Sequence, residues 1–480
     1  MFRGDAKSWM FLSLIFILAT TSCTHRSPRV NQSGFPEKDY QYQKPELIPD
    51  DWETASIKEA NIDSAKMNEM MQEILGGNDR NLHSILIVKN GKLVFEEYFY
   101  EYDRERLHYL ASVSKSITSI LVGIAMEQSP SDGVEKMVYE FFPEYSHTKW
   151  IDQKYPITLQ HVLTMSAGLD WDASKYSRKD PRHTTHQMYD SDDPAEFVLD
   201  RNTIRVAGDK FYYNSGLTIL LGEIVKSTSG MSIDEFAGKY LFEPLGISNY
   251  QWDKFNNGMI QTDGGLSLRP RDMAKVGYLM MKEGTWKGKQ IVSKKWVAES
   301  TRKHIDALGG GYGYQWWIGE TKTYDQPIEV LIATGHGGQK IFIIPEFDLV
   351  VVFTSKVFNP KGHTSPEGFL FHYILPAVDP SLVPKKAVPL TPEILEKYVG
   401  KYWSEEHHQK LPVIRKGDKL YIKESFWSKV ELKPRSTTQF FGESKQVGKV
   451  FINFVMDPYG QVKQFIAYLG FRGFRFDKIE

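Results

Sequence analysis

The chain contains very little cysteine, since Cys23 is the only one among its 480 residues. One thiol excludes an intramolecular disulfide and a metal site built from several cysteines. The chain also has no excess of either charge, because 59 lysines and arginines stand against 60 aspartates and glutamates. The chain therefore lacks the excess of positive charge that would favour nucleic acid as a partner. With 41% hydrophobic residues, the chain can bury one large core and still supply a smaller second domain.

An apolar run of transmembrane length is missing near the start of the chain, where Trp9–Ala19 is too short to cross a bilayer comfortably. Arg3 and Lys7 precede this run, and small or hydroxyl residues follow it, a layout that predicts a secretory signal over residues 1–22. Cys23 follows in a sequence that resembles a bacterial lipoprotein processing site, which implies a lipid on Cys23 that holds the protein to a membrane. We therefore expect an exported, periplasmic or cell-surface lipoprotein of a bacterium. An ordinary cleaved signal with an incidental cysteine is the alternative.

The remainder of the chain divides into regions of different composition. Residues 23–55 are polar and lack apolar periodicity, which is typical of a flexible linker. Residues 56–380 combine strand-like and helical blocks, and a proline-rich stretch at 381–391 indicates a second linker. Residues 392–480 contain short alternating runs separated by Gly, Asp and Asn, which predict a small all-β barrel or sandwich. The expected fold class is α+β with a C-terminal all-β domain.

Local patterns predict individual elements of the main domain. Apolar residues recur at helical spacing over Asn61–Leu75. Residues 84–99 indicate two strands joined by Asn90-Gly91, which is a strong hairpin signal. Residues 113–128 are apolar almost all round, so they predict a buried helix. A second strand-rich block follows at 329–355, and strands, then helices, then strands of one sheet form an α+β pattern.

Ser112 and Lys115 stand at the start of the predicted buried helix. Positions three apart lie on one helical face, so the hydroxyl and the amine can meet. A serine needs a nearby base to take its proton before it attacks a carbonyl, and a lysine serves where burial favours its neutral form. The helix N-terminus also presents backbone N–H groups to an oxyanion. The pair alone is a weak indication, because this spacing occurs by chance in many helices.

Two further stretches can complete such a centre. In Phe211–Gly216 a tyrosine, either Tyr212 or Tyr213, can relay a proton between the nucleophile and a leaving group; simple packing at a helix start is the alternative. In Gly335–Gly338, glycines beside a strand let a substrate backbone lie close to the strand edge. His336 can then hydrogen-bond the substrate or steady the tyrosine, although a lone histidine among glycines is more often a turn residue.

Together, these stretches resemble the serine β-lactamase, D-alanyl-D-alanine peptidase and esterase superfamily, especially its class C-like branch. The family's Ser-x-x-Lys motif is matched by Ser112 and Lys115, its Tyr-x-Asn motif by Tyr213-Asn214-Ser215, and its Lys-Thr-Gly or His-x-Gly motif by His336-Gly337-Gly338. The resemblance covers about residues 61–376. It implies the β-lactamase/DD-peptidase fold, an antiparallel sheet flanked by helices with an all-helical region.

The resemblance also implies catalytic roles. Ser112 is the expected nucleophile, and Lys115 and Tyr213 are expected to transfer its proton. Tyr213 is preferred to Tyr212 because the family pattern then aligns with residues 207–222 without gaps. Tyr212 remains the second candidate, since Tyr212-Tyr213-Asn214 also satisfies Tyr-x-Asn literally.

By the same resemblance, substrate binding is expected at Ser215, His336, Gly338 and Gln339, with the oxyanion held by backbone N–H groups of Ser112 and of a residue near Gln339. Ser215 stands where class C enzymes have asparagine, and His336 stands where they have lysine. A hydroxyl offers one donor where an amide offers two, and a neutral or partly charged histidine holds a carboxylate less firmly than an ammonium does. The pattern is therefore closer to the family's esterases and 6-aminohexanoate-dimer hydrolases, and β-lactam turnover is expected to be weak or absent.

We therefore expect a serine hydrolase, of the carboxylesterase or amidase kind, that acts on a small-molecule or peptide-like ester or amide and requires no cofactor and no metal. Asp170 and Asp172 are interpreted as solvated loop charges rather than metal ligands. The C-terminal domain is similar to the lipocalin-like β-domain found after many family members, and its Trp427 and Phe440 are expected to pack its core. The alternatives are a D-alanyl-D-alanine carboxypeptidase or class C-type β-lactamase, and a non-catalytic protein that binds peptide or glycan.

Overall fold

The computed structural model describes residues 40–76, 81–129, 133–148, 156–171, 180–307, 310–321, 327–356, 365–382, 387–405, 408–424, 428–444, 448–469 and 472–479. The predicted signal, Cys23, Asp172 and Trp427 lie outside these residues. Within the described ranges, no helix combines the length and the apolar character that crossing a membrane requires.

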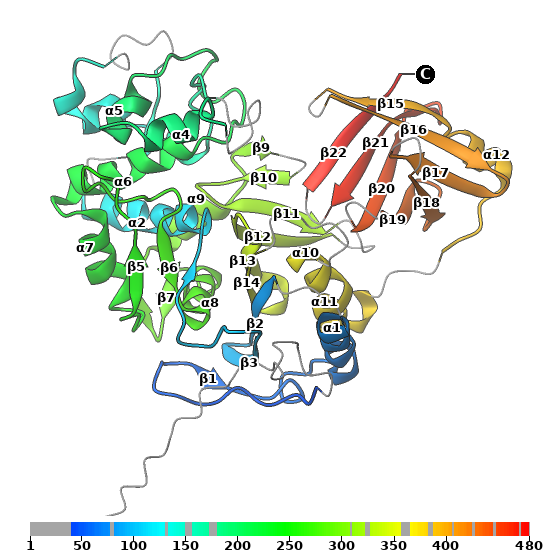
Figure 1. Ribbon diagram of the computed structural model, residues 1–480, viewed down its shortest axis with the longest axis horizontal. Helices are drawn as coiled ribbons and strands as arrows, with labels where there is room; N and C mark the ends of the chain where they lie inside the picture. Colours follow the sequence, from blue (N-terminus) through cyan, green and yellow to red (C-terminus); the bar gives the residue numbers. More distant parts are fainter. Residues whose placement is uncertain are drawn as a thin grey trace, which may run out of the picture.

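A nine-stranded sheet forms the centre of the main domain (Figure 1). In spatial order its strands are β1 (Glu53–Thr54), β3 (Lys92–Tyr98), β2 (Leu82–Lys89), β14 (Leu349–Ser355), β13 (Gln339–Ile344), β12 (Ile328–Gly335), β11 (Trp317–Thr321), β10 (Gly310–Tyr312) and β9 (Ile305–Ala307). β1 pairs with β3 in parallel, and the other neighbouring pairs are antiparallel. The hairpin predicted at Asn90-Gly91 is confirmed: both residues have positive φ, 52° and 77°, as in a type I′ turn.

Alternate residues of the central strands face opposite sides of the sheet, so the main domain has three layers. Leu86 and Val88 of β2 belong to one hydrophobic core, whereas Ile85 and Ile87 belong to the other. The strands β12, β13 and β14 alternate in the same way. The sheet is therefore buried on both faces, and each face requires a layer of helices.

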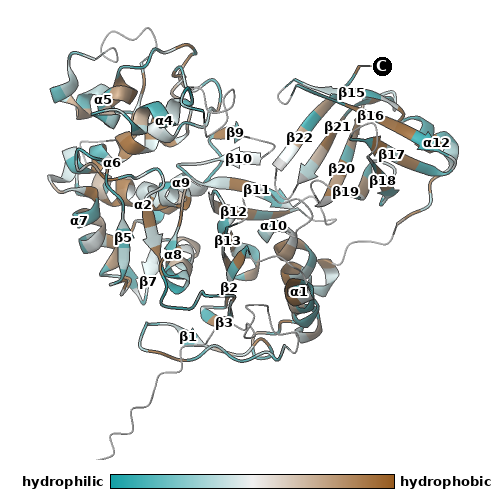
Figure 2. Ribbon diagram, viewed as in Figure 1, coloured by the Kyte–Doolittle hydropathy of each residue, from teal (hydrophilic) through white to brown (hydrophobic). Residues whose placement is uncertain are grey.

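Helices of unequal number cover the two faces. The larger core takes residues from α2 (Val113–Gln128), α3 (Leu159–Leu163), α4 (Thr184–Tyr189), α5 (Pro194–Leu199), α6 (Ser215–Ser229), α7 (Ile233–Ala237), α8 (Pro270–Met281) and α9 (Lys294–Thr301). The smaller core takes residues from α1 (Ser64–Gly76), α10 (Pro366–Phe369) and α11 (Leu375–Val378). Figure 2 shows hydrophobic residues gathered on α1, α2 and α6. The predicted helices at Asn61–Leu75 and 113–128 are thus confirmed as α1 and α2, although α1 begins at Ser64.

Short strands connect the helical region to the sheet. β4 (His108–Tyr109), β6 (Leu266–Leu268) and β5 (Tyr250–Trp252) form a three-stranded sheet in that order, and β7 (Thr285–Trp286) pairs with β8 (Lys289–Gln290). Because β4 ends three residues before Ser112, pairing with β6 fixes the chain that leads into α2. The backbone N–H of Leu110 extends this pairing by donating to Leu266 O at 2.9 Å.

The C-terminal region begins with α12 (Pro392–Glu396) and forms a closed antiparallel barrel, drawn from orange to red in Figure 1. Its strands are β15 (Gly400–Ser404), β16 (Gln409–Lys416), β17 (Lys419–Lys423), β18 (Lys429–Pro434), β19 (Gln439–Ser444), β20 (Gly448–Met456), β21 (Val462–Leu469) and β22 (Arg472–Lys478). Aromatic side chains fill the interior, among them Tyr398, Tyr402, Phe440, Phe454 and Phe465. The predicted α+β class with a small all-β domain is confirmed, and Phe440 packs in the barrel core as expected.

Candidate active site

Ser112 lies where the chain turns sharply into α2. The preceding residue, Ala111, has φ of 47°, a left-handed conformation that is uncommon for a residue with a Cβ. Ser112 is the N-cap residue of α2, but its side chain makes no capping hydrogen bond. The half-buried hydroxyl is therefore not used in capping, and the first helical turn is closed by the N–H groups of Val113 and Ser114, which donate to Leu110 O and Ala111 O.

Lys115 places its amine beside this hydroxyl from one turn further along α2. Its Nζ donates to Ser112 Oγ at 3.5 Å, so the predicted helical spacing brings the two groups together. Residues Val113 to Met126 are all buried, and Lys115 itself is only 2% exposed. An amine held in such an interior has little contact with water, so the protein groups around it must supply its hydrogen-bond partners.

The two candidate tyrosines point to different neighbours. The ring of Tyr213 lies 5.4 Å from Lys115 Nζ and stacks on Trp317 with ring centroids 6.1 Å apart. The ring of Tyr212 instead lies 4.8 Å from the guanidinium of Arg205. The geometry therefore favours Tyr213 as the phenol of the Ser112 centre, and its catalytic role remains a prediction.

Asn214 and Ser215 begin α6 with separate tasks. The Asn214 side chain is buried and accepts a hydrogen bond from Gly216 N at 2.8 Å, which caps the helix. Its amide is thus used in folding rather than at the surface of the centre. Ser215 is the first residue of α6 and is half-buried. This arrangement agrees with the register in which Tyr213 and Ser215 are the outer residues of the motif.

The glycine-rich turn between β12 and β13 lies against the turn that leads into Ser112. A Cβ at Gly335 would overlap the carbonyl oxygen of Leu110, so the two backbones touch. Gly337 and Gly338 have φ of 86° and 92°, which favours glycine at both positions. His336, between them and Gly335, is exposed. The turn thus presents its histidine to solvent while its backbone approaches the Ser112 centre.

Gln339, the first residue of β13, is buried and its side chain is occupied in the sheet. Its Nε2 donates to Ser355 O, and its Oε1 accepts from Ser355 N at 3.1 Å. The Ser355 hydroxyl donates to Gly337 O at 2.6 Å, which holds the glycine turn to β14. The expected contribution of Gln339 to a substrate is therefore limited to its backbone, as the sequence-based prediction assumed.

Asp263 is a residue of this centre that the sequence analysis did not assign. Lys115 Nζ donates to its backbone oxygen at 2.5 Å and lies 3.8 Å from its Oδ2. The hydroxyl of Tyr189 donates to the same Oδ2 at 2.8 Å. Asp263 is 4% exposed, so this carboxylate is an interior charge. No local pattern indicates it, because it is brought to Lys115 from the turn before β6.

A buried histidine pair lies behind the nucleophile turn and was also not predicted. Nδ1 of His83 and Nε2 of His108 are 2.7 Å apart, and Tyr102 stacks on His83 with ring centroids separated by 3.7 Å. His108 belongs to β4, which leads to Ser112. Both rings are buried, so they serve as packing and hydrogen-bonding groups rather than as exposed bases.

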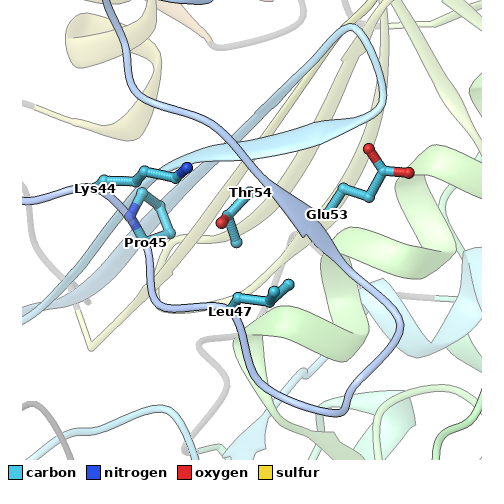
Figure 3. A pocket seen from close by; sticks show the side chains of 5 residues that line it. All are labelled: Lys44, Pro45, Leu47, Glu53 and Thr54. Carbon is cyan, nitrogen blue, oxygen red and sulfur yellow. The ribbon is translucent and has the colours of Figure 1, made fainter.

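A metal cluster or a separate pocket in the described residues would be an alternative candidate site. In the described part of the chain, no three His, Cys, Asp or Glu side chains gather as metal ligands would. A pocket of about 310 Å³ is lined by Lys44, Pro45, Leu47, Glu53 and Thr54 (Figure 3). It belongs to β1 and the segment before it, and none of its lining residues contacts the Ser112 centre. The candidate active site is therefore defined by Ser112, Lys115 and their neighbours.

Known proteins provide an independent comparison. The family model described as Beta-lactamase matches residues 67–369, and a model described as a domain of unknown function (DUF3471) matches residues 384–478. A curated relative, the 6-aminohexanoate-dimer hydrolase of Paenarthrobacter ureafaciens, is 27% identical over 299 residues, which are 58% of this chain and 73% of that protein.

Solved structures share the fold. A Bacillus anthracis protein has a TM-score of 0.55 at 21% identity, over 75% of this chain and 92% of its own. The octameric penicillin-binding protein homologue of Pyrococcus abyssi has a TM-score of 0.53 at 20% identity, over 86% and 99%. EstCE1, titled a hydrolase with promiscuous acyltransferase activity, has a TM-score of 0.53 at 17% identity, over 66% and 98%. The expected fold of β-lactamases and penicillin-binding proteins is thus confirmed.

The Beta-lactamase model covers more than half of the chain and includes Ser112, Lys115, Tyr213 and His336. The resemblance that these residues indicated in the sequence is therefore correct, and the chain belongs to the beta-lactamase family.

Proposed function

We propose that this chain is a serine hydrolase that cleaves ester or amide bonds through an acyl-enzyme on Ser112. The observation that supports this most directly is the position of Lys115, whose buried Nζ lies 3.5 Å from Ser112 Oγ and 5.4 Å from the ring centroid of Tyr213. A hydroxyl, an amine and a phenol gathered in this way are the groups that acyl transfer requires. The hydrolase named among the curated relatives acts on an amide dimer, which supports short amides as one substrate class.

The proposed reaction has two halves. In the first, Ser112 Oγ forms a bond to the substrate carbonyl carbon while its proton passes to the Lys115 and Tyr213 pair. Backbone N–H groups of Ser112 and of Gln339 hold the negative oxygen. The pair then returns the proton to the leaving amine or alcohol as its bond to carbon breaks. In the second half, water attacks the acyl-enzyme by the same route in reverse, which releases the acid and restores Ser112.

The test combines a covalent label with turnover. We expect a fluorophosphonate probe to modify Ser112, as located by peptide mass spectrometry, and the protein to hydrolyse p-nitrophenyl esters or short amides such as the 6-aminohexanoate dimer. Ser112→Ala is expected to abolish both signals. Ser146→Ala, which removes an exposed hydroxyl elsewhere, is the matched control and should retain them.

The remaining outcomes separate the alternatives. A stable adduct of labelled penicillin on Ser112 would favour a D-alanyl-D-alanine peptidase or a β-lactamase over an esterase or amidase. A folded wild-type protein that takes neither label and turns over no ester or amide would contradict the proposal and favour a binding protein that keeps the fold.

A further inference from the structure

We infer that Asp263 is a positioning residue that holds Lys115 as an ammonium ion, so that Tyr213 is the group that receives the proton of Ser112. This inference rests on the proposed function and assigns a task to a side chain that the family motifs do not include. It follows from the surroundings of the Lys115 amine, the charge of the carboxylate, and the way in which the Asp263 backbone is fixed.

The surroundings of Lys115 Nζ are anionic on one side. Asp263 supplies two of its neighbours, the backbone oxygen at 2.5 Å and the side-chain Oδ2 at 3.8 Å. Both side chains are under 5% exposed, at 2% for Lys115 and 4% for Asp263. A buried charge with no water needs an opposite charge close by, and each of these two groups supplies that charge for the other. The ammonium and carboxylate forms therefore stabilise each other.

Tyr189 donates a hydrogen bond to the carboxylate. The distance from its hydroxyl to Asp263 Oδ2 is 2.8 Å, so one acceptor position of this buried group is satisfied by the protein. Burial raises the pKa of Tyr189 far above its usual value, and the negative charge of Asp263 raises it further. The phenol therefore keeps its proton and acts only as a donor.

The turn that carries Asp263 is fixed between two helices. The hydroxyl of the preceding residue, Thr262, donates to Thr218 O of α6 at 2.7 Å, and Thr118 of α2 donates to Thr262 O at 3.3 Å. Asp263 therefore cannot move away from Lys115 without breaking contacts to both helices. Among the described residues, its Oδ1 has no hydrogen-bond partner although it is buried. Such an atom is costly to bury, so a polar residue without a task would be disfavoured here.

The other polar groups that face this pair come from four elements. Ser112 is the N-cap of α2, Tyr213 precedes α6, and Tyr189 ends α4. Tyr109 of β4 approaches the same turn, since a Cβ at Gly264 would lie 3.3 Å from its hydroxyl. These are hydroxyl groups, so Asp263 is the anion that balances the Lys115 ammonium. The Lys115 ammonium lies 5.4 Å from the centroid of the Tyr213 ring, so its positive charge is close to the phenol that we infer to be the base.

The experiment measures how acylation and turnover depend on pH. In Asp263→Asn the ammonium loses its counter-charge and gives up its proton more readily. The alkaline limb of kcat/KM, and of the rate of fluorophosphonate labelling, should therefore move to lower pH by about 1 to 3 units, as expected for a unit charge removed from this distance. Asp263→Ala, which also removes the unpartnered oxygen, should move the limb in the same direction. It provides a second variant without the carboxylate if Asp263→Asn does not fold.

Two controls isolate the charge. Tyr189→Phe removes the hydrogen bond but keeps the carboxylate, so its limb should move less than that of Asp263→Asn. Asp253→Asn removes a half-buried carboxylate from the same turn region, where it accepts from Gln251 Nε2 at 3.3 Å, and should leave the limb in place. An unmoved limb in both Asp263 variants, or an equal displacement in Tyr189→Phe or Asp253→Asn, would overturn the inference while labelling of Ser112 persists. A wild-type protein without labelling or turnover would overturn the proposed function and this inference together.

Discussion

Acid is expected to destabilise the main domain through the buried pair of His83 and His108. The short hydrogen bond between the two rings, 2.7 Å from nitrogen to nitrogen, needs one donor and one acceptor. The two rings therefore cannot be cations at the same time. Burial, together with the neighbouring His108 ring, lowers the pKa of His83 to about 3. Burial also lowers the pKa of His108 to about 4, with a smaller contribution from the Arg106 cation. The pair is therefore neutral in the folded protein across the neutral and mildly acidic range.

The sign of the pH effect follows from where protons bind more readily. In the unfolded chain a histidine titrates near pH 6.5, so the unfolded state binds more protons than the folded state below that value. The contribution of the neutral histidine pair to stability is fully present above about pH 6.5. It is lost as the pH falls toward the folded-state pKa values of the two rings. For a ring that stays neutral in the folded protein, each pH unit below 6.5 lowers the free energy of unfolding by about 1.4 kcal/mol. At about pH 4.5, the neutral ring of His108 alone therefore lowers it by about 3 kcal/mol. His83 acts in the same direction.

The assay compares thermal unfolding at about pH 7.5 and about pH 4.5. We expect the melting temperature of the wild type to fall further than that of the double variant His83→Gln, His108→Gln, by at least about 6 °C, since His108 alone contributes about 3 kcal/mol and 1 kcal/mol corresponds to about 2 °C in a domain of this size. Taking this difference removes the contribution of carboxylates, which both proteins share. His147→Gln, a control at a largely exposed ring paired with Glu196, should behave as the wild type does. Equal falls in the wild type and the double variant would refute the reasoning.

Three further predictions concern the site and the chain start. Tyr213→Phe should lower kcat/KM for an activated ester by at least about 100-fold, whereas Tyr212→Phe should change it by less than about threefold; equal losses would remove the preference for Tyr213. Gly338→Ala should lower the free energy of unfolding by about 1 to 3 kcal/mol, because its φ is 92° and a Cβ would overlap the Ser355 hydroxyl; a melting temperature equal to wild type would contradict this. Cys23→Ser, expressed in a bacterium, should move the protein from the membrane fraction to the soluble fraction, and an unchanged distribution would count against the lipid anchor.

Local periodicity was enough to predict the parts of the fold and site that depend on neighbours in sequence. The apolar pattern of residues 113–128 predicted α2, and the three-residue spacing within it predicted that Ser112 and Lys115 meet. The turn at Asn90-Gly91 likewise follows from the positive φ that both residues adopt. In each case the deciding contacts lie within a few residues of one another.

Contacts between distant segments were beyond the reach of such patterns. Lys115 and Asp263 are 148 residues apart, and their approach depends on how the turn before β6 packs between α2 and α6. His83 and His108 come together only when β2 and β4 are in place. The choice between Tyr212 and Tyr213 was made from a family alignment; in the structure it follows from which ring faces Lys115 and which faces Arg205. Side-chain direction of this kind is set by tertiary packing.

The direct contact between Gly335 and the Leu110 carbonyl has a consequence for how substrate preference can change in this protein. Because the backbones of Gly335 and Leu110 are in contact, the spacing between the end of β12 and the turn that carries Ser112 is fixed. The two segments cannot move closer together, and any side chain at position 335 would force them apart and displace Ser112. Under the proposed function, we therefore expect substrate preference to change through side chains such as those at positions 215 and 336, while the backbone around Ser112 stays as it is.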